Sequence, residues 1–257
     1  MERTEASGGV SWVEARQRIS PCAGADWISV AGAYAMFDGP DSPVTQTFGL
    51  GMFAETTAAG LDQLEGFFAE RGAPVNHEVS PLAGVALSAM LAGRGYRPVE
   101  FTSIMYQPVM LVESEPHHRL TTRRMNAGEE DLWARISVRG WAADHPEFTG
   151  FLTDLGHVIA ASEHSYCFFA ELDGAPVATA VLRVHEGMAH FAGASTVPEA
   201  RNHGAQRALL NARMAMAAGM GCDLVMMCAE PGSASQRNAE RQGFRIGYTR
   251  VKWSKTL

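Results

Sequence analysis

The sequence predicts an α/β protein with a mixed α+β sheet, built as two tandem units of similar element order. Apolar stretches of strand character alternate with amphipathic helical stretches along most of the chain. The pair Asp173-Gly174 separates two such strands and is a strong β-hairpin signal. The segment R-G-Y-R-P-V-E-F at Arg94 echoes Q-G-F-R-I-G-Y-T at Gln242. We interpret the first half as a degenerate copy of the second.

In the first half, the pattern predicts a helix over 59–71 that closes at Gly72, and a strand over 75–79. Ser80-Pro81 provides a cap followed by a proline at the first helical position, so a second helix is expected, ending near Gly93 to Gly95. Residues 96–106 then resume strand character. Between the strand-like residues 44–50 and the first helix, the loop E-T-T-A-A-G contains no arginine.

A seam is expected between Gln107 and Arg119, where two prolines interrupt any periodic pattern. It predicts one domain over 1–110, without a phosphate loop, and a second over 118–257. The second domain is expected to begin with a strand over 120–125. Asn126 and Glu129 then start a helix that ends near Gly140, and another helix covers 147–162.

Three antiparallel strands follow, and the remaining elements alternate between helix and strand. The expected strands are 166–172, 176–184 and 189–197, and the expected later elements are a helix over 204–218, a strand over 223–228, a helix from Ser233 to Gly243 and a final strand. That last strand leaves a sheet edge to be completed, either by the N-terminal half or by a partner chain in a homodimer.

Composition excludes several classes of protein. The net charge of −7 over 257 residues argues against a nucleic-acid partner, since phosphate backbones require a basic face. The N-terminus lacks the apolar core of a signal peptide, and no run is long enough to span a membrane. The four cysteines form no C-x-x-C pair and lack zinc spacing, which favours reduced thiols. We expect a cytoplasmic protein without a bound metal.

The segment V-P-E-A-R-N-H-G-A-Q-R-A-L-L, from Val197 to Leu210, carries the clearest functional signal. A strand-like stretch ends at Pro198, and a short polar loop leads through Gly204 into a helix. Unpaired backbone N–H groups at such a helix start bind phosphate well, and two arginines add positive charge. We therefore expect a phosphorylated ligand here.

This spacing resembles the signature of the GNAT acyltransferases, acetyl-CoA-dependent N-acetyltransferases whose loop reads Q/R-x-x-G-x-G/A. Arg201 and Gly204 match the pattern, and Gln206 departs from it. The Gly243-Phe244 ending of the last helix also resembles the family. The resemblance implies two tandem GNAT-like acyl-CoA N-acyltransferase units, with acetyl-CoA bound by the second. The implied cofactor-binding residues are Ser195, Thr196, Val197, Arg201, Asn202, His203, Gly204, Ala205, Gln206, Arg207 and Ser235.

The resemblance also implies a backbone N–H near Thr196 or Val197 that polarises the thioester carbonyl. His190 and Glu171 are the candidate general bases, whereas His203 is expected to touch phosphate or solvent. The family commonly places a tyrosine that protonates the departing thiolate four residues before the Gly-Phe pair. This chain has Ala239 at that position. Candidate replacements are Tyr248, Tyr166 and water.

The connection between the two early helices of a GNAT domain borders the acceptor cleft. Trp141, Asp144 and Phe148 lie in that connection and are candidate substrate residues, with a helix-end staple as the alternative. The implied activity is acetyl transfer to a primary amine of a small molecule or peptide, by direct attack on the thioester. The alternative is a non-catalytic CoA-binding or sensing protein that has lost the acyl-transfer residues.

Overall fold

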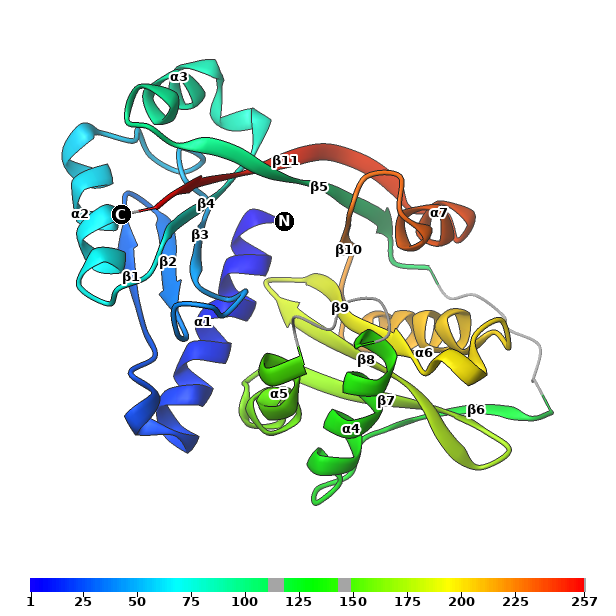
Figure 1. Cartoon of the computed structure of the whole chain (residues 1–257). Helices are drawn as coiled ribbons and strands as arrows, with labels where there is room; N and C mark the ends of the chain where they lie inside the picture. The colour runs from blue at the N-terminus through cyan, green and yellow to red at the C-terminus, as the bar shows by residue number, and fades with distance from the viewer. Residues whose placement is uncertain (111–117, 143–148, 257) are drawn as a thin grey trace. The chain divides into compact units, whose positions relative to one another are not determined.

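The computed structural model describes residues 1–110, 118–142 and 149–256 (Figure 1). The chain forms two compact units, each described below by itself. Unit 1 contains Met1–Met105 and Cys228–Leu257, and unit 2 contains Tyr106–Met227. The domains 1–110 and 118–257 stay a prediction, and Cys228–Leu257 groups with the N-terminal part in unit 1.

Unit 1 begins with a long helix, α1, that the sequence pattern did not reveal. Its elements in chain order are α1 (Glu2–Ile19), η1 (Pro21–Ala23), β1 (Asp26–Val30), β2 (Ala33–Phe37), β3 (Gln46–Phe48), α2 (Ala58–Ala69), β4 (Val75–Val79), η2 (Pro81–Ala83), α3 (Val85–Gly93), most of β5 (Arg97–Pro108), α7 (Ala234–Arg241) and β11 (Arg245–Lys255).

The strands of unit 1 follow the order β1-β2-β3-β4-β11-β5. Strands β3 and β4 are parallel and joined by α2, whereas β11 is antiparallel to β4, with Val251 opposite Val79. The N-terminal half therefore completes the edge of the final strand, which is one of the two predicted arrangements. Leu61, Leu64 and Phe68 of α2 are buried at helical spacing, in the region where the sequence predicts a helix.

Unit 2 contains a second set of strands and helices. These are the end of β5, then β6 (Leu120–Arg124), α4 (Glu130–Trp141), α5 (Thr149–Ala161), β7 (Ser165–Leu172), β8 (Ala175–His185), β9 (Met188–Thr196), η4 (Pro198–Ala200), α6 (Ala205–Gly219) and most of β10 (Leu224–Ala229). Their strand order is β10-β9-β8-β7-β6. Only β9 and β10 in this order pair in parallel; β6 to β9 are antiparallel.

Helices cover both faces of the sheet in unit 2. Residues 178–182 of β8 are buried without interruption, a pattern that requires cover on each face. Helix α4 contacts β8 and β9, and α6 contacts β6 to β9 (Figure 1). Trp133 of α4 is fully buried and its indole N–H donates to the Phe168 carbonyl at 3.1 Å. The core of unit 2 thus fixes α4 against the strands that lead to the predicted phosphate loop.

Local signals in the sequence form the predicted turns and caps. Asp173 and Gly174 both have positive φ, as the two-residue β7–β8 turn requires. The Glu129 carboxylate accepts from the Asn126 N–H at 2.8 Å, and Ser233 accepts from the Gln236 N–H at 3.1 Å. The second contact confirms the predicted start of α7. Helix α4 begins at Glu130 with Glu129 as its N-cap residue and without a side-chain cap, three residues beyond the cap expected at Asn126.

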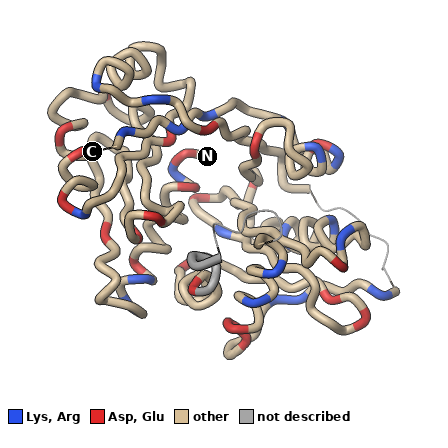
Figure 2. Tube along the Cα trace, in the orientation of Figure 1, with Lys and Arg blue, Asp and Glu red and all other residues tan. Residues whose placement is uncertain are grey.

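None of the helices in the described residues is both long and apolar enough to cross a membrane. Acidic and basic residues are interspersed along the trace of both units (Figure 2).

Candidate functional site

Strand β9 carries a bulge close to its C-terminal end. Thr179 lies opposite Ser195 and Val181 lies opposite Ala192, so β9 has one more residue than β8 between these pairs. Gly193 falls within this bulge and has φ +56°, a left-handed conformation that glycine adopts without a steric penalty. The bulge bends β9 and changes the direction in which its last residues point.

Beyond the bulge, β9 also leaves its pairing with β10. The register between these strands ends at Phe191 and Met227, whereas β9 continues to Thr196. The Val197 N–H donates to the Val177 carbonyl at 2.9 Å. Because antiparallel pairing alternates, the N–H of Thr196 points away from β8, toward the edge where pairing with β10 has stopped. Of the two amides considered for carbonyl polarisation, Val197 is thus engaged within the sheet.

A compact loop connects β9 to α6. Its first turn, η4, is closed by the Ala200 N–H to the Val197 carbonyl at 3.0 Å. Asn202 and Gly204 then adopt positive φ, at +67° and +83°. Left-handed residues in such a turn direct successive N–H groups toward one side of the backbone. Asn202, His203 and Gly204 are exposed to solvent.

Helix α6 begins without a side-chain cap. Gly204 is its N-cap residue and provides no hydrogen bond from a side chain. The first bond along the helix runs from the Ala208 N–H to the Gly204 carbonyl at 3.0 Å. The N–H groups of Ala205 and Arg207 therefore have no acceptor within the helix and lie at the positive end of its dipole. This arrangement suits an anion.

Arg201 binds backbone carbonyls at the start of the loop. Its Nη2 donates to the Gly140 carbonyl at 3.1 Å, and its Nε lies 3.4 Å from the Thr196 carbonyl. These contacts join the loop to the last turn of α4 and to the end of β9. Arg207 lies on an exposed position of α6 and leaves its charge facing solvent.

Sequence reasoning missed the close packing of α4 on β9. A Cβ at Gly140 would lie 2.6 Å from Ser195 Oγ and 3.0 Å from the Thr196 nitrogen, so only glycine fits. Ser195 Oγ lies 3.1 Å from Thr179 Oγ1 and donates to the Ser137 carbonyl at 3.3 Å. The hydroxyl of Ser195 thus fixes the end of β9, and its predicted role toward the cofactor stays a prediction.

The predicted bases occupy different environments in unit 2. His190 is buried on β9, at 5% exposure, opposite Arg183 of β8 and Met226 of β10. Glu171 accepts from Arg123 Nε at 2.7 Å, and this ion pair holds its carboxylate. The role of general base stays a prediction for both residues.

His203 of the loop interacts electrostatically with Asp173 in the β7–β8 turn. Hydrogen bonds from Arg119 lower the pKa of Asp173, and the charge of His203 adds to this effect. His203 therefore lies within electrostatic reach of an acidic group that also pairs with Arg119.

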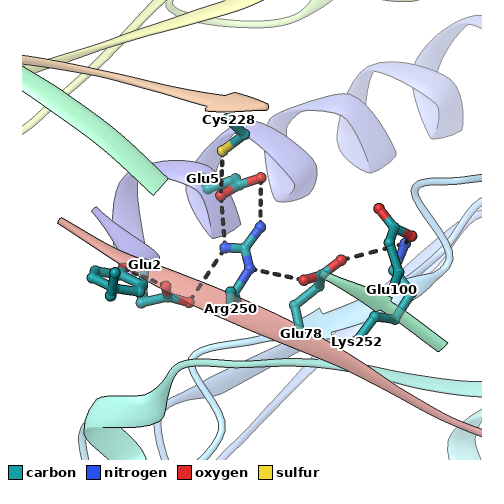
Figure 3. Close-up of polar contacts among 8 residues, drawn as sticks. Glu2, Glu5, Glu78, Glu100, Cys228, Arg250 and Lys252 are labelled. Atoms are coloured by element: carbon teal, nitrogen blue, oxygen red, sulfur yellow. Dashed lines mark hydrogen bonds and ion pairs between the residues drawn. The ribbon is translucent and has the colours of Figure 1, made fainter. Parts of the chain in front are cut away.

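Tyr248, the predicted acid, belongs to unit 1. Its hydroxyl donates to Glu2 Oε1 at 2.5 Å, and burial together with this carboxylate raises its pKa. Glu2 in turn adjoins Arg250, which is buried among three carboxylates (Figure 3). Arg250 donates to Glu5 at 2.8 and 3.1 Å and to Glu78 at 2.8 Å. A role of Tyr248 in proton transfer stays a prediction.

The other predicted residues are placed as follows. Ser235 lies in α7 of unit 1, and Ala239 in the same helix is buried and carries no hydroxyl, as the sequence states. The Phe244 N–H donates to the Ala239 carbonyl at 3.1 Å, which closes the helix at Gly243. Trp141 ends α4 and is half-buried. Asp144 and Phe148 lie outside the described residues.

Comparison with known proteins relates part of this sequence to a family and the fold to solved structures. Residues 131–244 match the acetyltransferase (GNAT) family. No curated protein matches the chain. Among solved structures, a GCN5-related N-acetyltransferase from Kribbella flavida is 17% identical, with a TM-score of 0.68 and coverage of 97% of this chain and 96% of that one.

Two further structures resemble the chain in fold. A tandem GNAT protein from the clavulanic acid biosynthesis pathway is 11% identical, with a TM-score of 0.62 over 95% of this chain and 87% of that one. A GCN5-related N-acetyltransferase from Sphaerobacter thermophilus is 17% identical, with a TM-score of 0.56 over 87% and 76%. Residues 131–244 thus match the acetyltransferase (GNAT) family, which identifies the chain as an acyltransferase, and its fold over most of its length is similar to that of a tandem GNAT protein.

Proposed function

We propose that this chain transfers the acetyl group of acetyl-CoA to a primary amine of a small molecule or peptide. One observation carries the proposal: the uncapped start of α6 follows, after a short loop, a strand that is bulged and has left its pairing with β10. A phosphate-binding helix end and a free strand edge are the two features needed to hold a phosphorylated thioester.

The start of α6 holds the pyrophosphate of the coenzyme. The N–H groups of Gly204, Ala205 and Arg207 donate to its oxygens, and the helix dipole favours the negative charge. Arg201 keeps the loop in place through its bonds to Gly140 and Thr196. The exposed Arg207 adds a positive charge that draws the coenzyme to the loop.

The edge of β9 beyond the bulge positions the thioester. The pantetheine arm pairs with this edge in the manner of an added strand. The Thr196 N–H, directed away from β8, donates to the thioester carbonyl as negative charge develops on its oxygen. This assignment follows from the engagement of the Val197 N–H with Val177.

The reaction is a direct attack without a covalent enzyme intermediate. The amine nitrogen forms a bond to the carbonyl carbon, the C–S bond breaks, and the bonding pair leaves with sulfur. The ammonium proton passes to His190, to Glu171 or through water. A thiol has a pKa of about 8.5, so the thiolate leaves without an obligatory acid. A strong donor at the position of Ala239 is therefore dispensable.

Release of free thiol from acetyl-CoA tests the proposal. The protein is mixed with acetyl-CoA and a panel of primary amines, including diamines and basic peptides, and thiol is followed with a chromogenic disulfide. We expect amine-dependent release with at least one class of acceptor. Binding of CoA should be measured in parallel by calorimetry. Absence of both binding and release would contradict the proposal.

A second candidate function is a CoA-binding sensor without catalysis. The observation that favours it is Ala239, an apolar residue where the family commonly has a tyrosine. The same two measurements separate the candidates. Micromolar binding without thiol release from any amine supports the sensor, whereas amine-dependent release supports the transferase.

A further inference from the structure

Arg213 of α6 is a buried cation without a carboxylate partner among the described residues. Its exposure is only 3%, and burial alone lowers the pKa of its guanidinium to about 9. Buried arginines are rarely found without an ion pair, because removing the charge from water is costly. Arg250, by contrast, is a buried arginine that forms ion pairs with three carboxylates. Arg213 therefore requires an explanation beyond ordinary core packing.

Its donors bind backbone carbonyls at the β9 bulge. Nη1 donates to the Val181 carbonyl at 3.1 Å and lies 3.5 Å from the Ala192 carbonyl. Val181 and Ala192 lie opposite each other and are the last aligned pair before the bulge. Nε donates to the Leu209 carbonyl at 3.1 Å, within α6. One guanidinium thus connects α6 to both strands at the point where their register changes.

The aromatic ring next to this pair adds a second contact. The guanidinium carbon of Arg213 lies 4.5 Å from the ring centroid of Phe191, the last residue of β9 that pairs with β10. A cation over a ring is stabilised most where water is excluded. Arg213 therefore touches β9 on both residues that precede Gly193.

Hydrogen bonds to the carbonyls beside a bulge help to keep it at one place in the strand register. The extra residue interrupts the ladder, and buried carbonyls without donors are unfavourable. If the two strands slipped by one residue, every side chain and amide of β9 beyond the slip would face the other way. The position of the Thr196 N–H depends on the bulge remaining at Gly193.

We propose that Arg213 is a positioning residue for acyl transfer: it holds the β8–β9 bulge so that the edge of β9 up to Thr196 presents its N–H to the thioester. This role rests on the proposed function. The pyrophosphate site lies eight residues earlier in α6, roughly 12 Å along the helix, so Arg213 is not expected to affect binding of the coenzyme directly.

The test compares three variants of the full chain. Arg213→Met keeps the length of the stem and removes the charge and the donors. Arg213→Lys keeps the charge with a smaller set of donors. Met214→Leu changes the neighbouring buried residue of the same helix and serves as the control for core packing. Each is measured by circular dichroism, CoA calorimetry, amine-dependent thiol release, and hydrogen exchange of peptides from β9.

The expected result is a loss in kcat without a matching loss in affinity. Arg213→Met should lower kcat on the order of 10- to 100-fold, the cost of a small misplacement at a reacting centre, and keep the Kd for CoA within about threefold. Exchange in β9 should rise. Arg213→Lys should recover part of kcat, and Met214→Leu should match the wild type in every readout.

Other results would overturn the inference. Wild-type kcat and wild-type exchange in Arg213→Met would show that the bulge does not depend on this side chain. An equal loss of kcat and CoA affinity in Arg213→Met and Met214→Leu would show a general packing effect. If the wild-type protein released no thiol with any amine, the proposed function itself would fail, and the positioning role would fall with it.

Discussion

Helices α2 and α6 each follow a strand through a loop, and their starts are capped differently. Helix α2 follows β3 in unit 1, and α6 follows β9 in unit 2. At α2, the Thr57 hydroxyl accepts from the Gly60 N–H at 3.1 Å. At α6, Gly204 brings no side-chain acceptor. One helix satisfies one of its first amides with a side chain, whereas the other brings no side-chain acceptor to its start.

The glycines in the segments before the two helices also differ in how closely they are packed. In unit 1, the side chain of Phe53 lies next to Gly32 and Gly49: a Cβ at Gly32 would lie 2.8 Å from Phe53 Cβ, and one at Gly49 would lie 2.9 Å from its ring. The guanidinium of Arg3 lies 4.2 Å from the centre of that ring. In unit 2, a Cβ at Gly204 would meet its nearest neighbour only at 3.8 Å. A shared element order therefore does not imply a shared helix start.

The largest effect is expected from closing the open helix start. Gly204→Asp places a carboxylate where the pyrophosphate is proposed to bind, and it should weaken CoA binding by at least about 100-fold, close to 2.7 kcal/mol. Gly204→Asn, which tolerates the left-handed backbone and adds no charge, should have a smaller effect. Calorimetry measures both.

The control for this prediction lies at the other end of the same helix. Gly219 is exposed and has open space around it, so Gly219→Asp adds the same charge away from the loop. It should bind CoA as the wild type does. Equal weakening by the two aspartates would mean that net charge, not the helix start, governs affinity.

The next effect belongs to unit 1 and depends on pH. His77 is fully buried, and burial lowers its pKa from 6.5 to about 3. Below pH 6.5 the unfolded chain binds a proton that folded His77 refuses, so stability falls as the pH drops from 6.5 toward 3. Between pH 7 and pH 5 the loss should be about 2 kcal/mol.

Urea unfolding at the two pH values measures this loss. The difference should shrink by that amount in His77→Gln, which does not titrate. The His77 ring contacts Tyr96 at 3.1 Å within unit 1, so CoA affinity of the folded wild type at pH 5 should not follow the stability. An identical pH dependence in wild type and variant would contradict the assignment.

A smaller effect is expected from Arg201. Arg201→Met removes the bonds to the Gly140 and Thr196 carbonyls, so the loop loses its fixed position and CoA should bind about tenfold more weakly. Because the cause is geometric, the loss should persist at high salt. The loss in Arg207→Met, a simple charge effect at an exposed residue, should fade as salt is raised.

The smallest effect is expected from removing the cap in unit 1. Thr57→Ala should cost about 1 kcal/mol of stability, the usual value of an N-cap, and should leave CoA binding unchanged. Denaturation in urea and calorimetry measure the two quantities. A gain of a second CoA site in this variant would contradict this expectation, because it would show that the cap suppresses binding in unit 1.

Features set by neighbouring residues were predictable from the sequence. The turn at Asp173-Gly174, the cap at Ser233 and the loop from Arg201 to Gly204 each depend on a few adjacent residues, and the structure has all three. Helix α1 was not predicted, because Gly8-Gly9 in its middle disfavours a helix. Gly9 is used there for packing: a Cβ would lie 2.3 Å from Met36 Sδ.

The remaining parts of the site depend on contacts between distant residues. The glycine in F-A-G-A-S-T signals a bulge only once β9 is aligned with β8. Arg213 resembles any helical arginine in the sequence, and its burial becomes visible only when α6 lies on the sheet. Tyr248 contacts Glu2, 246 residues away, so its surroundings could not be read from neighbouring residues.

The most direct test of the account is a crystal structure of the protein with coenzyme A. We expect the pyrophosphate oxygens within hydrogen-bond distance of the N–H groups from Gly204 to Arg207, and the sulfur beside the end of β9. Coenzyme A bound at another helix start, or a loop that stays empty at saturating ligand, would contradict the central claim.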